Sequence, residues 1–496
     1  MANKKRKFYI TTTLPYVNAE PHIGFALEIV QADVIARYWR QQGYEVFFNT
    51  GVDEHGLKVF RKTQEENLDP QVYCDIYAKR YESLKQALNL SYNSFIRTTN
   101  PHHIKAAQEF WRRCDKNGDI YKKDYKIKYC VGCELEKTES ELVEGRCPIH
   151  PDQELEIIEE ENYFFRYSRY QDKLLELYRE NPQFVLPESR LNEIKEFTKR
   201  GLADFSISRL KEKMPWGVPV PGDNKHVMSV WFDALVNYIS SLDWPDNVEK
   251  CNEFWPGLQV AGKDNLRQQS SMWQAMLISV GLPTSKQIFI HGFITVAGQK
   301  ISKSLGNVID PFELVKKYGT DAVRYFLLRE IPPTEDGDFT YQKFGERYNA
   351  DLASGLGNLV ARVLTMAKNL KTQNSNLKTT SQNLKLKEEI NKTQKNYKKA
   401  LAEFKFNEAL ISIWGLISFC DKYIEKERPW EKSKKQKETI GNLLLAVNEI
   451  AKLLQPFLPE TAEKIFKQLG VKPTDKKPWK FKIKKEKPLF PRLTKI

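Results

Sequence analysis

The first fifty residues change from a strand pattern to a helix pattern and back again. The run Lys7–Leu14 is rich in β-branched and aromatic residues, which is typical of a strand. Apolar residues then recur three or four positions apart from Ile23 to Tyr38, which is the period of a helix, and Gly43 ends that helix. A second strand begins at Glu45–Phe48. This order predicts a βαβ unit in a parallel sheet, where ligands bind at the carboxyl ends of the strands.

The pattern changes between about residues 118 and 225. This part holds a cysteine cluster, an acidic stretch and a turn-rich segment, so it looks like an insertion. Parallel-strand patterns return at Val227–Phe232, Leu258–Ala261 and Gln287–Ile290. We therefore expect the sheet to be completed after the insertion.

The last third of the chain has a helical pattern. Asp310, which a proline follows, predicts the start of one helix, and Thr320 predicts the cap of another. The segments 351–370, 386–428 and 438–468 read as long helices. Three or more such helices indicate a helical bundle.

Composition narrows the class of protein. With 496 residues, 41% of them hydrophobic and 12% aromatic, the chain can bury a large core and is not largely disordered. Its 78 basic and 64 acidic residues leave a net charge of +14, which favours an anionic partner, although solubility alone would also explain it. The basic N-terminus lacks an apolar signal core, and no stretch approaches the roughly 18 apolar residues that span a membrane. We expect a cytoplasmic protein without a membrane segment.

Two short motifs carry the clearest chemistry. The first places His22 and Gly24 at a helix start, where an imidazole and a residue without a side chain suit a flat ring or a phosphate. The second, which contains Lys300, Ser302 and Lys303, places lysines and hydroxyls on a loop, where they can neutralise charge on a phosphoryl leaving group. Taken alone, His22 also fits an ordinary helix-cap histidine, and the second motif fits a solvated loop.

A cysteine cluster supplies a further signal. Cys130 and Cys133 are followed, after thirteen residues, by Cys147 and His150. Three thiolates and one imidazole at this spacing suit tetrahedral zinc, and four protein ligands make such a site structural rather than catalytic. The alternative is four reduced, unliganded side chains. Gly132 permits the tight turn between the first two ligands.

The two short motifs, with a parallel sheet between them, resemble the HIGH and KMSKS signatures of class I aminoacyl-tRNA synthetases. Further motifs narrow the resemblance to the methionyl-tRNA synthetase family, and the matches run from about residue 8 to the C-terminus. These motifs are Thr13–Asn18, Thr50–Gly56, Pro187–Arg209, Val230–Ala234 and Gly262–Asp264. The resemblance implies an α/β protein with a Rossmann-like parallel-sheet catalytic domain, a zinc-knuckle insertion and a C-terminal α-helical bundle.

The resemblance also implies a division into five regions. The catalytic domain is expected at 1–117 and 226–292, with the connective zinc-knuckle insertion at 118–225. A connector that carries the KMSKS loop and contacts the tRNA stem is expected at 293–350. The helical anticodon-binding domain, with its basic tail, is expected at 351–496.

Members of this family activate L-methionine with ATP to methionyl-adenylate and transfer the methionyl group to tRNA(Met). The resemblance implies that His22, Gly24, Lys300, Ser302 and Lys303 bind ATP, which brings Mg²⁺ with it. His22, Lys300 and Lys303 are the implied catalytic residues, since the two lysines hold the leaving pyrophosphate.

An amino-acid site is implied as well, with a carboxylate for the α-ammonium group and a largely aromatic pocket for the thioether. Its residues are Leu14, Tyr16, Asp53, Trp231, Tyr238 and Gln269. For Trp231 and Tyr238 the alternative is ordinary core packing.

The sequence departs from the family pattern at a few positions. Phe25 replaces the usual final histidine of the first motif and cannot donate a hydrogen bond to phosphate. Gln269 stands where a pocket histidine is expected, and Asn265 where an apolar wall is expected. Met272 occupies a position that is commonly aromatic. We therefore expect methionine as substrate, with the far end of its pocket rebuilt.

RNA is expected to bind the helical domain. The family implies that Asn358 and Arg362, which share one helical face, read the CAU anticodon together with Trp430. The alternatives are a helix cap for Asn358 and a core anchor for Trp430. The segment 471–496 carries a net charge of +8, from ten basic and two acidic residues, and either contacts the tRNA backbone or only solubilises the chain. Its apolar run Pro488–Arg492 is expected to return to the body of the protein.

Two rival interpretations remain open from the sequence. One is a class I synthetase with a shifted amino-acid specificity, and the other is an inactive paralogue that only binds tRNA. Asp53, Lys300 and Lys303 favour an active enzyme. Because the chain ends without the C-terminal RNA-binding and dimerisation module of some family members, we expect a monomer.

Overall fold

The structure is a computed structural model that describes residues 5–137, 139–301, 306–370, 384–431, 435–475, 481–484 and 486–494. The chain forms two compact units, and each is made of separate stretches of sequence. The first comprises Met1–Pro21, Trp39–Lys85 and Ser91–His291. The second comprises His22–Tyr38, Gln86–Leu90 and Gly292–Ile496.

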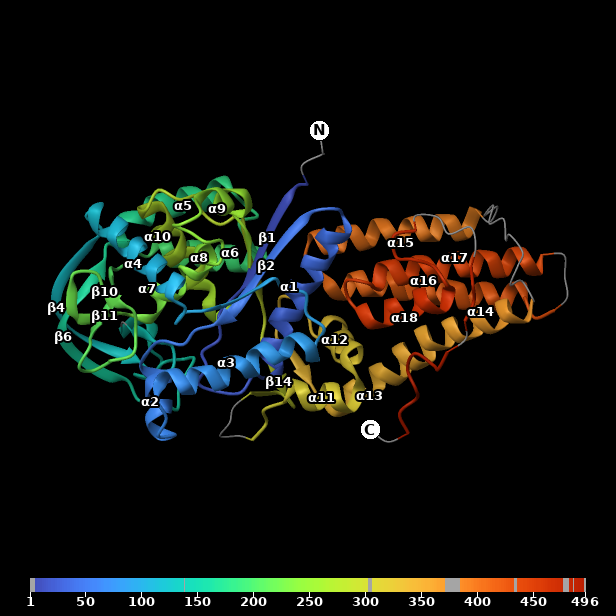
Figure 1. Cartoon of the computed structure of the whole chain (residues 1–496), viewed down its shortest axis with the longest axis horizontal. Helices are drawn as coiled ribbons and strands as arrows, with labels where there is room; N and C mark the ends of the chain where they lie inside the picture. Colours follow the sequence, from blue (N-terminus) through green and yellow to red (C-terminus); the bar gives the residue numbers. More distant parts are fainter. Residues whose placement is uncertain are drawn as a thin grey trace. The chain divides into compact units, whose positions relative to one another are not determined.

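A six-stranded parallel sheet forms the centre of the first unit (Figure 1). The strands follow the order β3-β2-β1-β12-β13-β7, and every neighbouring pair is parallel. Their bounds are Ser94–Arg97 (β3), Glu45–Val52 (β2), Lys7–Thr12 (β1), Leu258–Gly262 (β12), Gln287–His291 (β13) and Val185–Leu186 (β7). The predicted βαβ unit is confirmed, with α1 at Ile23–Gln41 between β1 and β2.

Helices and an aromatic core pack around this sheet. The helices are α2 (Leu57–Glu65), α3 (Pro70–Ala87), α4 (Pro101–Lys116), α5 (Gln171–Glu180), α6 (Glu188–Lys199), α7 (Val230–Ala234), α8 (Asn237–Ser240), α9 (Val248–Phe254) and α10 (Trp273–Ser279). Phe110 on α4 stacks on Trp273, with ring centroids 5.6 Å apart, and meets Phe232 edge-on at 6.0 Å. These contacts join α4, α7 and α10 into one core.

The region that looked like an insertion contains two antiparallel sheets. The larger sheet has the order β5-β4-β6-β8, and the smaller has the order β10-β11-β9. Their bounds are Leu135–Lys137 (β5), Ile120–Cys130 (β4), Glu156–Phe165 (β6), Phe205–Ser206 (β8), Pro219–Val220 (β10), Asp223–Met228 (β11) and Ser208–Leu210 (β9). One strand in this stretch, β7, pairs instead with β13 of the parallel sheet.

The parallel strand expected at Val227–Phe232 is wrong. Val227 and Met228 end the antiparallel strand β11, which pairs with β9. The chain then enters α7, so Trp231 and Phe232 are helical. The expected strand combined the end of one strand with the start of a short helix. Periodicity cannot separate a strand from a helix over so short an apolar run.

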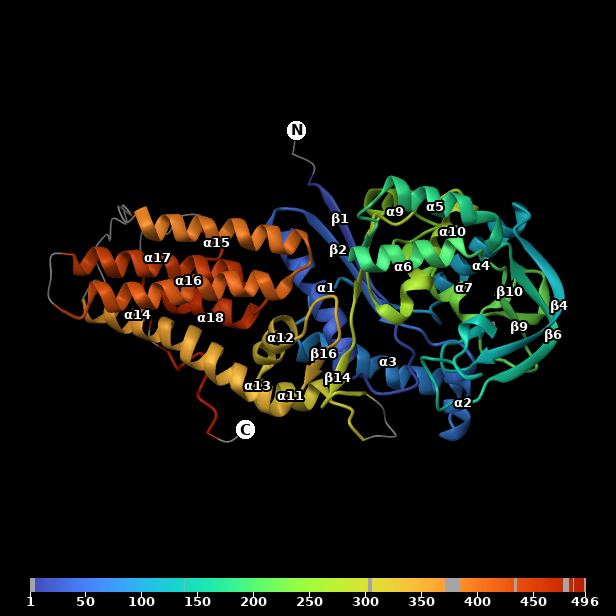
Figure 2. The same cartoon turned by 180° about the vertical axis from the view of Figure 1, so that it is seen from behind.

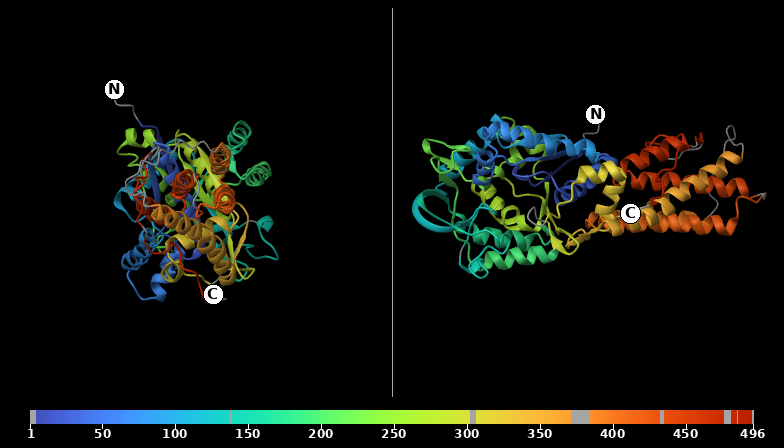
Figure 3. Two further views of the ribbon diagram at one scale, coloured as in Figure 1. Left: turned by 90° about the vertical axis from the view of Figure 1, so that its right-hand side faces the viewer. Right: turned by 90° about the horizontal axis from the view of Figure 1, so that it is seen from below.

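Long helices dominate the second unit (Figures 1 and 2). They are α11 (Pro311–Tyr318), α12 (Thr320–Arg329), α13 (Tyr341–Arg347), α14 (Asn358–Asn369), α15 (Leu384–Ala402), α16 (Phe406–Glu427), α17 (Gln436–Leu454) and α18 (Pro459–Leu469). The unit also contains a small sheet of β15 (Gln299–Lys300), β14 (Ile294–Val296) and β16 (Gly337–Phe339). In sequence, β14 and β15 come before α11, and β16 lies between α12 and α13. The views in Figure 3 show α14 to α18 lying alongside one another, so the predicted bundle is confirmed.

The helix boundaries correct several details of the predicted bundle. The segments 386–428 and 438–468 each contain two helices. Phe404, between α15 and α16, has a left-handed backbone with φ of 56°, and the prolines at 456 and 459 separate α17 from α18. The segment 351–370 begins within a π-helix, η5 (Tyr348–Gly357), before α14.

One of the two predicted helix caps is confirmed. Asp310 accepts the Phe312 N–H at 2.7 Å and begins α11. Thr320 is instead the first residue of α12, and its hydroxyl donates to the Ala87 carbonyl at 2.9 Å. Among the described residues, no helix is long and apolar enough to cross a bilayer.

Candidate functional site

His22 and Gly24 form a tight turn at the start of α1. The Gly24 N–H donates to His22 Nδ1 at 3.0 Å, so the neutral ring carries its proton on Nε2. Burial lowers the pKa of His22, which keeps the ring neutral near pH 7. A Cβ at Gly24 would lie 2.8 Å from His22 Cε1, so no side chain fits there while the imidazole keeps this position. The turn presents an N–H donor beside helix N–H groups, a combination that suits phosphate oxygens.

Lys300 lies on β15 and is exposed. It pairs with Thr295 of β14, and Asn307 donates a side-chain N–H to the Lys300 carbonyl at 3.0 Å. Ser302 and Lys303, which the sequence places in the same motif, lie outside the described residues. The predicted contact of these lysines with pyrophosphate therefore stays a prediction.

In the first unit, Tyr16, Asp53 and Trp231 lie close together. Tyr16 and Asp53 form a parallel bridge just beyond the ends of β1 and β2. The Tyr16 and Trp231 rings meet edge-on, with centroids 6.3 Å apart. The Tyr16 hydroxyl is buried without a hydrogen-bond partner among the described residues. An acid and two aromatic rings thus share the carboxyl edge of the sheet, where ligands of parallel sheets bind.

Asp53 is buried in a negative environment. Its Oδ1 accepts the His55 N–H and the Thr98 hydroxyl, each at 3.3 Å. Burial, together with the nearby charge of Asp233, raises the pKa of Asp53 well above its usual value. A cation bound here would replace lost hydration and offset the repulsion, so the site favours an ammonium group.

His55 and Asp233 are site residues that sequence reasoning missed, although both lie in motifs of the family. His55 Nδ1 and Asp233 Oδ2 are 2.9 Å apart and buried, and the other oxygen of Asp233 has no partner among the described residues. Trp216 meets the His55 ring edge-on at 5.7 Å. Because 178 positions separate His55 and Asp233, only the folded chain shows that they pair.

The remaining pocket candidates differ in burial. Leu14 is half-buried beyond β1. Tyr238 on α8 is buried, its ring meets Trp273 at 5.8 Å, and its carbonyl accepts the Tyr9 hydroxyl. These contacts anchor the ring and the backbone of Tyr238 in the core. Trp231, in contrast, is only partly buried.

Gln269 belongs to a buried amide network. It lies in a π-helix, η4 (Gln268–Met272), and its Oε1 accepts the Gln259 side-chain N–H at 3.1 Å. Gln274 donates to the Gln269 carbonyl at 2.6 Å and to the Ser285 hydroxyl at 3.0 Å. Ser285 in turn donates to Gln259 at 2.5 Å. The amide at the position of the expected histidine is therefore held by neighbouring side chains, and buried networks of this kind fix one geometry.

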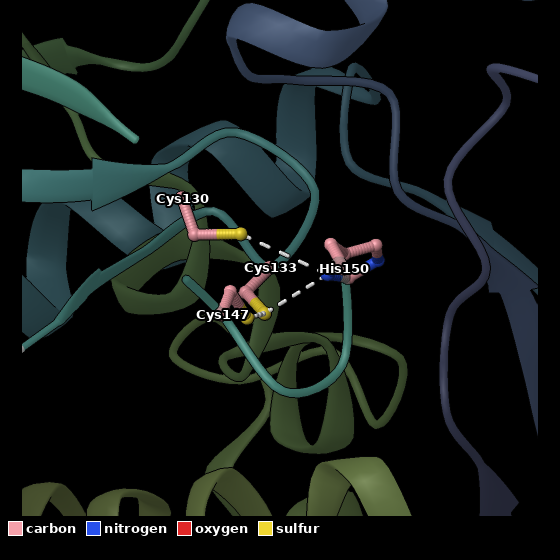
Figure 4. A group of neighbouring side chains, drawn as sticks. All are labelled: Cys130, Cys133, Cys147 and His150. Atoms are coloured by element: carbon pink, nitrogen blue, oxygen red, sulfur yellow. Dashed lines mark hydrogen bonds between the residues drawn. The ribbon is translucent and has the colours of Figure 1, made fainter. Parts of the chain in front are cut away.

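The predicted metal ligands converge in the structure (Figure 4). The ligand atoms of Cys130, Cys133, Cys147 and His150 all lie within 4.8 Å of one another. His150 Nδ1 is 3.3 Å from the Cys133 sulfur and 3.7 Å from the Cys130 sulfur, and hydrogen bonds from Cys133 and His150 lower the pKa of Cys130. A Cβ at Gly132 would lie 2.5 Å from His150 Cγ, so glycine is required here for packing against the ligand. The four side chains can hold one metal ion.

The predicted anticodon residues lie in the second unit. Asn358 is exposed at the start of α14, and Arg362 is one turn further along. Arg362 pairs with Glu425 of α16 at 2.6 Å and with Asp421 at 3.5 Å. Trp430, which follows α16, is 51% exposed, so it is not a core anchor. An exposed indole of this kind can stack on a base.

Comparison with known proteins decides the family. The profile described as tRNA synthetases class I (M) matches residues 8–154 and 151–364, and that of the anticodon-binding domain of tRNA ligases matches 384–490. The chain is 44% identical to the methionine–tRNA ligase of Thermotoga maritima, over 94% of this chain and 75% of that protein. It is 43% identical to the enzyme of Thermosynechococcus vestitus, over 93% of this chain and 90% of that protein. The chain belongs to the class I methionyl-tRNA synthetase family.

Solved structures agree with this assignment. The methionyl-tRNA synthetase of Mycobacterium tuberculosis in complex with methionyl-adenylate superposes with a TM-score of 0.93 and 37% identity. The match covers 98% of this chain and 100% of that chain. The resemblance inferred from short motifs is thus confirmed over nearly the whole chain, together with the fold class of the family.

Proposed function

We propose that this methionyl-tRNA synthetase family member activates L-methionine with ATP and then charges tRNA(Met). In the first step the methionine carboxylate attacks the α-phosphorus of ATP, and pyrophosphate leaves with the electrons of the broken P–O bond. In the second step a ribose hydroxyl of the terminal adenosine attacks the carbonyl carbon, and AMP leaves. The observation that carries the proposal is the buried Asp53 carboxylate beside Tyr16 and Trp231 at the carboxyl edge of the sheet, in a chain of this family.

The nucleotide half of the reaction is assigned to the two signature motifs. His22 donates from Nε2 to a phosphate oxygen, since its Nδ1 already accepts from Gly24. Lys300 and Lys303 neutralise the leaving pyrophosphate, and Ser302 binds ATP beside them. Mg²⁺ would accompany ATP and offset part of the negative charge of its phosphates. None of these groups forms a covalent bond, so their contribution is positioning and charge stabilisation.

The methionine half is assigned to the sheet edge. Asp53 holds the α-ammonium, because a buried carboxylate in a negative environment gains most from a cation. Tyr16 and Trp231 provide aromatic walls for the thioether, with Leu14 and Tyr238 completing the lining. Gln269 supports the far end of the pocket through its bond to Gln259.

Zinc is the metal that best fits the cysteine cluster. Cys130, Cys133, Cys147 and His150 supply three sulfurs and one nitrogen, the ligand set of structural zinc sites. The ion would bind the turn around Gly132 to the second ligand pair. With all four positions filled by protein, the ion would hold the fold and take no part in the reaction.

Recognition of the tRNA is assigned to the second unit, where Asn358, Arg362 and Trp430 read the anticodon. The five sequence regions, from the catalytic halves to the anticodon-binding domain at 351–496, belong to this proposal. We further propose that the protein acts as a monomer in the cytoplasm.

Pyrophosphate exchange with each amino acid in turn tests the proposal. We expect methionine to give the highest kcat/KM, and Asp53→Asn to raise the KM for methionine at least about tenfold, because it removes the charge partner of the ammonium. A higher kcat/KM with another amino acid would establish the shifted-specificity alternative. Absence of exchange with every amino acid, while tRNA(Met) still binds, would establish the inactive paralogue.

A further inference from the structure

The turn that carries the first two metal ligands also contacts both aromatic walls of the proposed methionine pocket. The Trp231 indole N–H donates to the Cys133 carbonyl at 3.3 Å. The Lys58 ammonium donates to the Gly132 carbonyl at 3.1 Å and lies 5.1 Å from the centre of the Tyr16 ring. One carbonyl of this short turn therefore accepts a hydrogen bond from Trp231. The other accepts one from Lys58, which in turn lies over the Tyr16 ring.

Glu134 completes this connection from the other end of the turn. It is 2% exposed and adopts a left-handed backbone with φ of 53°. One carboxylate oxygen accepts the Lys58 backbone N–H at 2.8 Å, in the first turn of α2, and the other accepts the Tyr129 hydroxyl. An acid that caps a helix N–H in this way fixes the position of the helix start, and with it the Lys58 side chain.

Lys58 is well placed to act on Tyr16. An ammonium over an aromatic face is attracted by the ring, and the attraction is stronger where both groups are shielded from water. The Tyr16 hydroxyl has no hydrogen-bond partner among the described residues, so this ring is held by packing and by Lys58 rather than through its polar end. Loss of Lys58 would release the ring while leaving the sheet intact.

We propose that Lys58 and Glu134 are positioning residues that couple the metal-bound turn to the methionine pocket. They hold Tyr16 and Trp231 at the geometry that the metal ligands impose on residues 130–134. The inference rests on the proposed function, and it makes the structural metal a determinant of substrate affinity. Occupancy of the cluster sets the affinity for methionine and leaves the nucleotide half of the reaction unaffected.

Lys58→Met tests the proposal, because it keeps the length of the side chain and removes the donor and the charge. We expect the KM for methionine in pyrophosphate exchange to rise about tenfold, with the KM for ATP unchanged. Lys58→Arg, which restores a cation and donors, should recover most of the loss. Lys62→Met is the matched control: Lys62 lies one turn further along α2, pairs with Glu65 and is 38% exposed, so its replacement should change neither constant.

Metal content and direct methionine binding separate this role from a merely structural one. We expect the Lys58→Met protein to retain one zinc per chain by mass spectrometry, and to bind methionine about tenfold more weakly by calorimetry. Chelation should weaken methionine binding in the wild type by a similar factor, but should add little in Lys58→Met, since the connection is already broken.

Two results would overturn the coupling. One is unchanged methionine affinity in Lys58→Met, and the other is an equal effect of chelation on both proteins. If Lys58→Met unfolds, Glu134→Gln at full metal content provides the same comparison, with Lys58→Arg as the variant that should stay near the wild type. An unchanged methionine affinity in Glu134→Gln would then contradict the proposal. Failure of the proposed function has a different signature, because the wild type itself would then neither bind methionine nor support exchange.

Discussion

At the scale of single residues, Gly24 shows how a missing side chain shapes the nucleotide motif. A methyl group at this position would lie 2.8 Å from His22 Cε1 and must displace the imidazole. We expect Gly24→Ala to lower the kcat of pyrophosphate exchange about 100-fold, since misplacing a reacting group by about 1 Å has costs of that order. Gly415→Ala is the control, because a Cβ at this other helical glycine meets nothing within 4 Å. Equal activity of the two variants would contradict this role of the glycine.

His103 makes stability depend on pH. It is fully buried, its Nδ1 is bonded to Ser240 at 2.8 Å, and burial lowers its pKa to about 3 from a usual value of 6.5. Between these values the unfolded chain binds a proton that the folded protein does not, so stability falls as the pH falls. At pH 5 the loss from this residue is about 2 kcal/mol relative to pH 7.

Urea unfolding at pH 7 and pH 5 measures this effect. Between pH 7 and pH 5, His103→Asn should lose about 2 kcal/mol less of its free energy of unfolding than the wild type. The exposed neighbour His102 supplies the control, and His102→Asn should follow the wild-type profile. If His103→Asn and the wild type lost stability in parallel, protonation of His103 would not be the cause.

Residue types and spacing predicted the metal cluster because its ligands lie within 21 positions of each other, and a cysteine pair needs few neighbours to be recognised. The same reasoning could not find Lys58 and Glu134, or the pair of His55 and Asp233. Their partners lie 76 and 178 positions away along the chain. A charged residue in an exposed helix and one in a pocket wall have the same local sequence pattern.

At the scale of elements, periodicity predicted those whose environment is uniform along their length. The strands β1, β2, β12 and β13 are buried, and their apolar runs were located to within a few residues. Breaks inside the long helices were missed, because a left-handed residue such as Phe404 has no signature in apolar spacing. The π-helices η4 and η5 share the apolar pattern of α-helices and were equally invisible.

A buried ion pair joins α12 to α1 within the second unit. Arg324 and Asp33 are both fully buried, with Nη2 2.9 Å from Oδ2, and Arg324 also donates to the carbonyls of Leu88, Pro456 and Phe457. Arg324→Met leaves Asp33 with Arg37, whose Nε lies 2.7 Å from the same oxygen, as its remaining ion-pair partner here. It also removes the donor to the three buried carbonyls, so we expect it to destabilise the protein by about 3–5 kcal/mol in urea unfolding.

Removing both charges should cost less than removing one. Arg324→Met combined with Asp33→Leu is expected to recover part of the loss, because the buried carboxylate is gone as well. Lys467→Met provides the surface control: its pair with Glu486 is exposed, and its loss should cost about 1 kcal/mol or less. Equal costs for Arg324→Met and Lys467→Met would show that burial of the pair adds nothing.

At the scale of the whole molecule, the make-up of the compact units could not be predicted from the sequence. The second unit includes His22–Tyr38, which the sequence places inside the first βαβ unit. The cause is a set of contacts between distant positions, such as Asp33 with Arg324, and local patterns do not encode such contacts. The predicted return of the apolar run near the C-terminus is confirmed, because Phe490 is 9% exposed and meets Tyr348 edge-on at 5.9 Å.

The basic C-terminal segment gives the last prediction. Its backbone is held on α18, where the Lys482 N–H donates to Leu469 and the Lys484 N–H to Gln468, while the side chains of both lysines and of Lys487 are exposed. Lysines on a fixed backbone lose little entropy when they meet phosphates. We therefore expect replacement of all three by glutamine to reduce the salt slope of tRNA(Met) binding by about 2–3, at about 0.7–0.9 for each phosphate contact.

Filter binding over a range of salt concentrations measures the slope, and pyrophosphate exchange should stay unchanged, because the first step needs no tRNA. A second triple variant, with glutamine at the exposed positions Lys395, Lys398 and Lys399 of α15, lowers the net charge equally. It should leave the slope closer to that of the wild type, since counterion release follows phosphate contacts rather than net charge. Identical slopes for the two triple variants would mean that the C-terminal lysines act only through total charge, which is the solubilising role.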